Sequence, residues 1–274
     1  MGSIKLRSPV VAGTFYPKNA ESIKKEINGF LKGGKRDQSK VIGCVLPHAG
    51  YLYSGKVAAI TLSQIDIPER VILLGPNHTG NGAVCSIMTD GAWETPLGNV
   101  KIDNKLAKLI LSSSKYLEDD NEAHLGEHSL EVELPMLQYF KDDFEIVPLA
   151  FMTQDLNMLR EIGRGIANAI KDSDYRGRVM FLASSDMTHY EADEEARAKD
   201  KKAIEAILAL DEERLMREIK NYCISMCGSA PVAVMISAAK SLGAKSGELI
   251  AYQTSGDVTG DKSNVVGYAG IIIN

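Results

Sequence analysis

Hydrophobic residues along the chain gather in continuous runs, and the strongest run covers residues 71–74. Gly75 and Pro76 end it, and a histidine, His78, follows two residues later. Four to eight apolar, mostly branched residues bounded by glycine and proline are typical of a strand that is buried in a parallel sheet between two layers of helices. The pattern therefore predicts a central parallel strand that ends at a histidine.

The same arrangement occurs twice more. Residues 41–46 form an apolar run that leads to His48, and residues 178–184 form another that leads to His189. His48 and His78 are separated by the length of one βαβ unit. Ligands of open α/β sheets bind at the carboxyl ends of strands, so we expect the three histidines to meet at one end of the sheet.

Apolar residues at helical spacing predict helices between these strands, at residues 21–31, 55–64, 104–112, 130–140, 155–170 and 193–219, and one that opens within residues 226–231 and runs to about residue 242. Ser54 and Ser129 are candidate caps for the helices at 55–64 and 130–140. Further strands are predicted at residues 83–89, 145–151, 249–253 and 265–273. Pro148 interrupts one of them, which predicts that this strand lies near a sheet edge or at a bulge. Alternating strands and helices predict a single α/β domain over residues 1–274, with a mainly parallel, mixed sheet flanked by helices.

Composition and charge exclude several classes of protein. A hydrophobic content of 45% with 24% charged residues is ordinary for a globular chain and excludes a disordered or fibrous one. The net charge of −5 at pH 7 argues against nucleic acid as a partner, because binding to phosphates requires a basic surface. No apolar run approaches the roughly 18 to 20 residues of a membrane span, and residues 1–7 lack the apolar core of a signal peptide. We therefore expect a soluble, cytoplasmic protein without a membrane partner.

Cysteine and histidine supply the candidate chemistry. The four cysteines are too few and too irregularly spaced for a disulfide framework. One of them, Cys227, precedes an apolar helix, where the helix dipole favours a thiolate. A lone histidine is usually a core or loop residue, but three at strand ends beside a cysteine favour a metal site. His124 lies outside these patterns, and we expect it in a surface loop.

Five motifs occur along the chain in a fixed order: Pro47-His48-Ala49-Gly50-Tyr51, Gly75-Pro76-Asn77-His78, Glu127-His128-Ser129-Leu130-Glu131, Ser184-Ser185-Asp186-Met187-Thr188-His189-Tyr190 and Cys227-Gly228. Together they cover nearly the whole chain and resemble the MEMO family, whose prokaryotic members are called AmmeMemoRadiSam system protein B. The fold of that family is similar to the LigB-type class III extradiol dioxygenases, which are α/β proteins with a non-haem iron site. The resemblance is specific because all five motifs are present.

The resemblance implies roles for four residues. His48 and His78 fill the two imidazole ligand positions, and His189 matches the histidine that performs acid–base work beside the metal. Cys227 falls where the dioxygenases have a carboxylate ligand. Because a thiolate makes the site softer and better suited to copper, we expect one ion of iron or copper, and the extradiol activity does not carry over.

Four further residues are candidates for the same pocket. Tyr51, Asn77 and His128 are candidates for substrate contacts, although a tyrosine packed in the core is the favoured alternative for Tyr51 and His128 could equally belong to an ordinary capped helix. Asp186 is expected to assist His189 in catalysis by orienting its imidazole or by joining the layer around the metal. An aspartate at a strand end is also a common turn former, so this alternative stays open.

Two functions of different classes follow. The first is a metalloprotein with a His2Cys iron or copper site and redox or oxygen-dependent chemistry on a small substrate. The alternative is a non-catalytic pocket that binds a peptide or protein partner, as the resemblance implies for eukaryotic members that bind phosphotyrosine segments. Zinc-dependent hydrolysis is a third, disfavoured function that a His2Cys set with an open position also allows.

Overall fold

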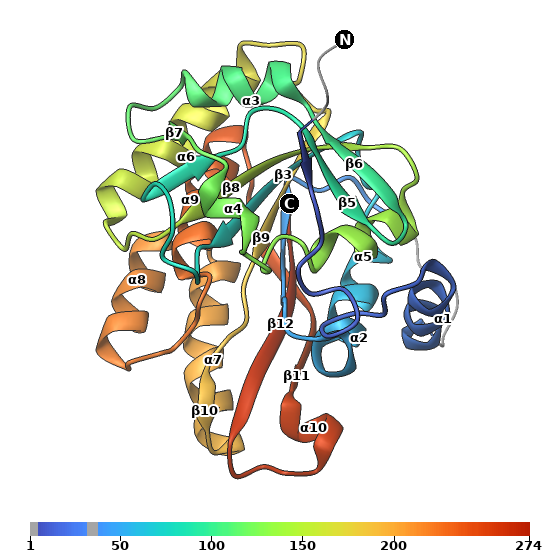
Figure 1. Cartoon of the computed structure of the whole chain (residues 1–274). Coiled ribbons are helices and arrows are strands. Elements are labelled where there is room, and N and C mark those ends of the chain that lie inside the picture. The colour runs from blue at the N-terminus through green and yellow to red at the C-terminus, as the bar shows by residue number, and fades with distance from the viewer. Residues whose placement is uncertain (1–4, 32–37) are drawn as a thin grey trace.

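Five parallel strands form the centre of the sheet in the computed structural model, which describes residues 5–31 and 38–274 (Figure 1). In spatial order they are β6 (Gly98–Ile102), β8 (Glu145–Phe151), β3 (Arg70–Pro76), β9 (Val179–Ser184) and β2 (Gly43–Leu46). From Val71 to Leu74, β3 is fully buried, as its continuous apolar run predicts.

Antiparallel strands extend the sheet on the β2 side. They are β12 (Val265–Ile273), which pairs with β2, and β11 (Gly247–Thr254) and β10 (His189–Glu191), which both pair with β12. The β6 side carries β5 (Ala92–Thr95) and β1 (Leu6–Arg7), while β8 also pairs with β4 (Cys85–Ile87), which pairs with β7 (Glu118–Asp119). The prediction of a mainly parallel, mixed α/β sheet is confirmed.

Helices cover both faces of this sheet (Figure 1). One group consists of α3 (Asn104–Leu111), α6 (Leu156–Lys171), α7 (Asp193–Leu208), α8 (Glu212–Asn221) and α9 (Ser229–Leu242). The other group consists of α1 (Ala20–Phe30), α2 (Tyr51–Leu62), α5 (Glu133–Phe140) and α10 (Ser255–Thr259). The short α4 (Glu122–Leu125) precedes α5. In the part of the chain that the structure describes, no helix is both long and apolar enough to cross a membrane.

Some predicted helix boundaries are wrong. The helix predicted over residues 193–219 is two helices, because Leu210 adopts a left-handed φ of 54° between them. Asp211 then begins α8 by accepting a hydrogen bond from the amide of Arg214. Ser54 lies inside α2 and Ser129 precedes α5 by several residues, so neither residue is the helix cap that the sequence suggests.

Pro148 lies in the interior of the sheet, so the prediction of an edge position is wrong. β8 pairs with β3 on one side and with β6 and then β4 on the other. The carbonyl of Pro148 accepts a hydrogen bond from the amide of Met88, just beyond β4. The nitrogen of the same residue faces that side, where the partner of β8 changes from β6 to β4, so the missing N–H breaks no regular ladder.

Candidate metal centre

Three neighbouring strands deliver side chains to one end of the sheet. β3, β9 and β2 lie side by side, and the residues two positions beyond their ends are His78, Asp186 and His48. Parallel strands in register end at the same level, so equivalent positions after the strands come together. After β9, the position equivalent to His48 and His78 is therefore occupied by Asp186. His189 lies three residues farther along, at the start of β10.

Cys227 reaches the same place from the turn before α9. A Cβ atom on Gly228 would overlap the carbonyl oxygen of Ser184, so only glycine permits this close approach to the end of β9. The amide of Gly228 donates a hydrogen bond to Ser185 Oγ at 2.9 Å, which fixes the turn. As a result Cys227 Sγ lies 3.3 Å from His48 Nε2.

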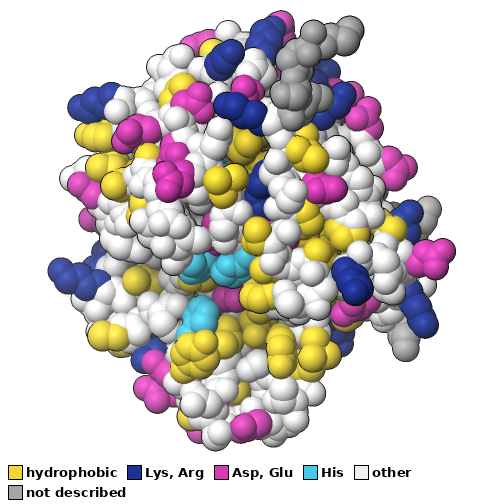
Figure 2. Space-filling model, viewed as in Figure 1, with side chains coloured by type: hydrophobic (Ala, Val, Ile, Leu, Met, Phe, Trp, Pro, Cys, Tyr) yellow, Lys and Arg dark blue, Asp and Glu magenta, His cyan; other side chains and the backbone are white. Residues whose placement is uncertain are grey.

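The candidate ligand atoms of His48, His78 and Cys227 all lie within 4.8 Å of one another. The structure thus brings together the three residues that the sequence nominates as metal ligands. Figure 2 shows histidine side chains gathered around a hollow near the middle of one face, with hydrophobic side chains beside it. Two imidazoles and a thiol are a donor set that iron, copper and zinc all accept.

A buried carboxylate holds His78 in place. Glu127 Oε1 accepts a hydrogen bond from His78 Nδ1 at 2.9 Å, and Oε2 of the same carboxylate accepts the backbone amide of His78. Burial alone would raise the pKa of Glu127, but these bonds and one from the amide of Ser129 outweigh it and lower the pKa to about 2. The ionised carboxylate leaves His78 Nε2 free, as in carboxylate–histidine pairs at metal sites.

His128 completes a cluster of three imidazoles. Its ring stacks on His78 with centroids 4.9 Å apart and meets the ring of His48 edge-on at 5.6 Å. The side chain is partly exposed, and His128 Nδ1 lies 3.5 Å from Glu127 Oε1. His128 therefore lines the cluster, where it is available to a bound molecule.

His48 is the most deeply buried of the three. Burial, followed by the neighbouring rings of His78 and His128, lowers the pKa of His48 well below its usual range. The imidazole is neutral at pH 7, which is the form that binds metals. His48 Nδ1 lies 2.8 Å from Ser184 Oγ, and Nε2 faces Cys227.

The thiol of Cys227 differs from the thiolate that its position before a helix predicts. Burial, followed by the charge of Asp186, raises the pKa of Cys227 well above its usual range. Cys227 lies two residues before the first residue of α9 and is partly buried, and the loss of hydration outweighs the helix dipole. A metal that binds here must displace the thiol proton.

Asp186 supports the loop that carries His48. Its Oδ1 accepts hydrogen bonds from the backbone amides of His48 at 2.9 Å and Ala49 at 3.2 Å. Burial raises the pKa of Asp186 to about 6, although the nearby imidazole of His189 opposes the shift. The backbone amide of Asp186 also points at Cys227 Sγ, 3.3 Å away, so this residue joins both candidate ligands.

His189 lies beside the cluster and is partly exposed. Its Nδ1 donates to the carbonyl oxygen of Ser225 at 2.9 Å, and its amide donates to Ser225 Oγ at 2.7 Å. Ser225 therefore fixes the orientation of the His189 ring, whereas the Asp186 carboxylate accepts hydrogen bonds from the backbone of His48 and Ala49. His189 is outside the group of three ligand atoms that lie within 4.8 Å of one another.

Three predicted positions differ from the structure. Tyr51 is a core residue that is 2% exposed, and its hydroxyl donates to the carbonyl of Val132, so it does not present a polar group to a substrate. The side-chain oxygen of Asn77 accepts the amides of Thr79 and Gly80 and shapes its own loop. His124, expected in a surface loop, is fully buried against Trp93.

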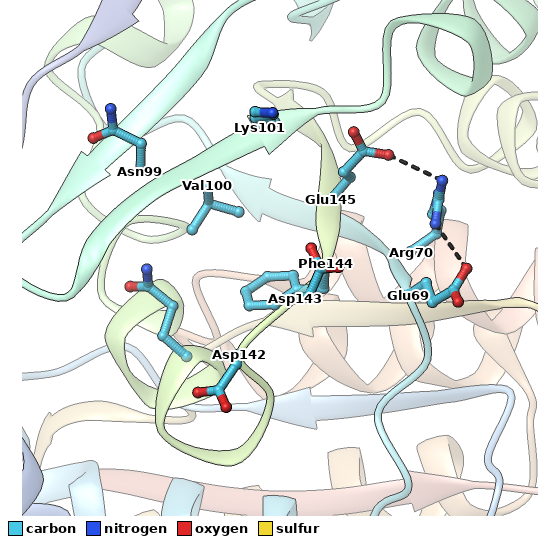
Figure 3. A pocket seen from close by; sticks show the side chains of 10 residues that line it. Glu69, Arg70, Asn99, Val100, Lys101, Asp142, Asp143, Phe144 and Glu145 are labelled. Atoms are coloured by element: carbon cyan, nitrogen blue, oxygen red, sulfur yellow. Dashed lines mark hydrogen bonds and ion pairs between the residues drawn. The ribbon is translucent and has the colours of Figure 1, made fainter.

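A polar cleft of about 370 Å³ lies at the opposite end of the sheet (Figure 3). Arg70, at the start of β3, is paired there with Glu69, Glu145 and Asp103 at 2.9–3.1 Å. These charges satisfy one another, and none of the described residues that line the cleft is a histidine or a cysteine, so it does not repeat the donor set of His48, His78 and Cys227.

Comparisons with known proteins identify relatives of this chain. Residues 7–272 match the family model described as "Memo-like protein". A MEMO1 family protein of Methanopyrus kandleri is 46% identical, over 97% of this chain and 98% of its own, and one of Aquifex aeolicus is 43% identical, over 98% and 99%. The crystal structure of an uncharacterized protein of Escherichia coli K12 shares the fold, with a TM-score of 0.51 and 12% identity over 84% of this chain and 99% of that one.

Proposed function

Because the chain belongs to the Memo-like protein family, we propose that it is a metalloprotein in which His48, His78 and Cys227 hold one ion of iron or copper. The observation that carries the proposal is the convergence of these three donors within 4.8 Å at the carboxyl ends of the strands. The neutral ring of His48 and the clamp of Glu127 on His78 fit ligand roles. The soft sulfur donor favours copper or iron over hard cations such as magnesium.

Such an ion, when bound, would supply redox or oxygen-dependent chemistry on a small substrate. His189 is the proposed proton carrier. Because its Nδ1–H is used in the bond to Ser225, the neutral ring has its lone pair on Nε2, where it can accept a proton. His128 is the proposed contact for substrate. Asp186 holds the loop of His48 next to the thiol of Cys227, because its carboxylate accepts the amide of His48 and its own amide points at the sulfur.

Metal analysis tests this proposal directly. The protein should be purified without a histidine tag and its metal content measured by mass spectrometry. Stoichiometric iron or copper is the expected result. Stoichiometric zinc would contradict it in favour of hydrolysis, and protein that neither contains nor takes up metal would favour a pocket for a peptide or protein partner.

Two cysteine variants test the sulfur ligand. Cys227 lies in the cluster, whereas Cys223 is an exposed free thiol only four positions earlier in the chain. We expect Cys227→Ser to weaken metal binding and Cys223→Ser to leave it unchanged, as measured by titration with zinc or copper. Equal effects of the two substitutions would mean that Cys227 has only a structural role before α9.

A further inference from the structure

A buried hydroxyl and a buried carboxyl lie behind His48, on the side away from Cys227. Ser184 Oγ is 2.8 Å from His48 Nδ1, 2.8 Å from the carbonyl oxygen of Ser129 and 2.9 Å from Glu133 Oε1. All four residues are at most 2% exposed, so water does not compete for these contacts. The proposed function assigns no role to Ser184 or Glu133.

Counting hydrogens decides which atom donates in each contact. A serine hydroxyl has one hydrogen and two lone pairs, and a backbone carbonyl can only accept. The single hydrogen of Ser184 must therefore point to Ser129, because two oxygens 2.8 Å apart without a hydrogen between them repel each other. The remaining two contacts are bonds only if Ser184 accepts both of them, from His48 Nδ1–H and from a protonated Glu133.

The surroundings of Glu133 agree with this count. Burial raises the pKa of Glu133 well above its usual range, and the charge of Asp186 adds to the rise. Glu133 is the first residue of α5, so its side chain is held by a rigid element. A neutral carboxyl can remain buried here without an opposite charge.

We propose that Ser184 is a positioning residue: its hydrogen is directed to Ser129, so it holds His48 in the tautomer with hydrogen on Nδ1, while the neutral Glu133 anchors Ser184 by donating to its other lone pair. The Nε2 lone pair of His48 then faces Cys227 Sγ, 3.3 Å away, where a bound ion would sit. The two tautomers of a neutral imidazole are close in free energy, so one buried hydrogen bond is enough to select between them. The value of this tautomer for metal binding rests on the proposed function, whereas the tautomer itself is a property of the metal-free protein.

The first experiment reads the tautomer without any substitution. Nitrogen NMR of metal-free protein labelled with ¹⁵N-histidine distinguishes a protonated Nδ1 from a protonated Nε2. We expect His48 to carry hydrogen on Nδ1 at pH 7. A hydrogen on Nε2 would overturn the proposal. If Nδ1–H is found but neither iron, copper nor zinc binds, the metal site is contradicted and the tautomer assignment stands.

Substitutions at Glu133 then test the positioning role. Glu133→Gln supplies an amide N–H that can replace the carboxyl hydrogen, whereas Glu133→Met has a similar length and no donor. We expect the Gln variant to keep the wild-type tautomer and its zinc affinity within about threefold. The Met variant keeps the bond from Ser184 to Ser129, so we expect it to keep the tautomer, but it should bind zinc about 10-fold more weakly because Ser184 loses its second anchor. Equal zinc affinity of the two variants would overturn the role of Glu133.

Ser184→Ala and a matched serine variant complete the test. Ser184→Ala removes the hydroxyl that touches His48, and we expect a mixture of tautomers and at least about a 10-fold loss of zinc affinity. Ser237 is a buried serine in α9 whose hydroxyl donates to the carbonyl of Arg160, so Ser237→Ala removes a comparable bond away from the centre. Ser237→Ala should change neither the His48 tautomer nor the zinc affinity. If it lost as much zinc affinity as Ser184→Ala, the loss in Ser184→Ala would be explained by general destabilisation of the protein.

Discussion

At the scale of single residues, His189 is expected to take part in proton transfer without binding the metal. Its Nδ1 is occupied by Ser225, and it stands outside the group formed by His48, His78 and Cys227. We therefore predict that His189→Ala retains the metal, while His48→Ala and His78→Ala lose it. Metal content of the purified variants measures this directly. A loss in His189→Ala as large as in the other two would indicate a closed, four-ligand structural site.

Asp186 makes the free energy of unfolding of the metal-free protein depend on pH. Burial raises the pKa of Asp186 from 3.8 to about 6, so between these values the folded state holds a proton that the unfolded chain has released. The free energy of unfolding therefore falls as pH rises through this window, by up to about 3 kcal/mol. An asparagine can still accept the amides of His48 and Ala49 but does not titrate.

We accordingly predict that Asp186→Asn gains stability relative to the wild type as pH rises from about 4 to about 7. Urea unfolding of both metal-free proteins across this range provides the measurement. A difference that stays constant with pH would mean that the carboxyl of Asp186 titrates alike in the folded and unfolded states.

The sequence predicts a ligand residue where a local motif marks that residue. His48, His78 and Cys227 each follow or precede a predicted element, so their meeting place follows from the topology. Glu127, Glu133 and Ser184 were missed as supports because their partners lie 49 to 136 positions away, and nothing local marks such pairs. Tyr51 and Asn77 were assigned by nearness in sequence, which does not reveal that their polar atoms turn to the backbone.

At the scale of elements, the approach of α9 to β9 controls the position of Cys227. An alanine at position 228 would drive its Cβ into the carbonyl oxygen of Ser184, so the start of α9 must move. We predict that Gly228→Ala costs about 1–3 kcal/mol of stability and weakens zinc binding, because Cys227 moves with the turn. Calorimetry and zinc titration measure the two effects.

Gly29→Ala is the matched control for this prediction. Gly29 lies in α1, and a Cβ atom added there would have no neighbour within 4 Å among the residues that the structure describes, so the substitution should be neutral or raise stability by up to about 1 kcal/mol. Zinc binding should not change. If Gly228→Ala bound zinc as well as Gly29→Ala does, the close approach would not be what places the sulfur.

Helices and strands were predictable where the pattern of apolar residues is strong and the element has the same surroundings along its length. The buried runs of β3, β2 and β9 follow from composition alone, because a strand covered on both faces needs apolar residues throughout. The interior position of Pro148 could not be predicted, since it depends on a change of partner from β6 to β4 that involves remote segments. The break at Leu210 was missed because no glycine or proline marks it.

At the scale of the whole molecule, a buried ion pair joins the start of the chain to the segment that supports the centre. The guanidinium of Arg7 pairs with Glu131 and donates to the carbonyls of His124 and Glu127. Glu131 also accepts the hydroxyl of Tyr16. Since Glu127 clamps His78, the first strand of the chain is coupled to a candidate ligand through these contacts, and breaking such a buried pair is costly.

A bound ion would join parts of the chain that are far apart in sequence, since its candidate ligands are at positions 48, 78 and 227. The unfolded chain does not hold these donors together, so the ion should bind the folded state and stabilise it. At a free zinc concentration about 100 times the dissociation constant, the gain is about 2.7 kcal/mol, which corresponds to an increase of about 5–11 °C in the unfolding midpoint of a chain of this size.

Because His48 and His78 follow strands of one continuous sheet and Cys227 precedes a helix that packs on that sheet, we predict that zinc moves a single calorimetric transition upward as a whole. Cys227→Ser should show a smaller increase at the same zinc concentration, and Cys223→Ser the full one. A zinc-dependent shift of only part of the transition would mean that the ligands belong to separately unfolding units. An increase of equal size in both variants would show that zinc stabilises the protein at a place other than the His48, His78 and Cys227 cluster.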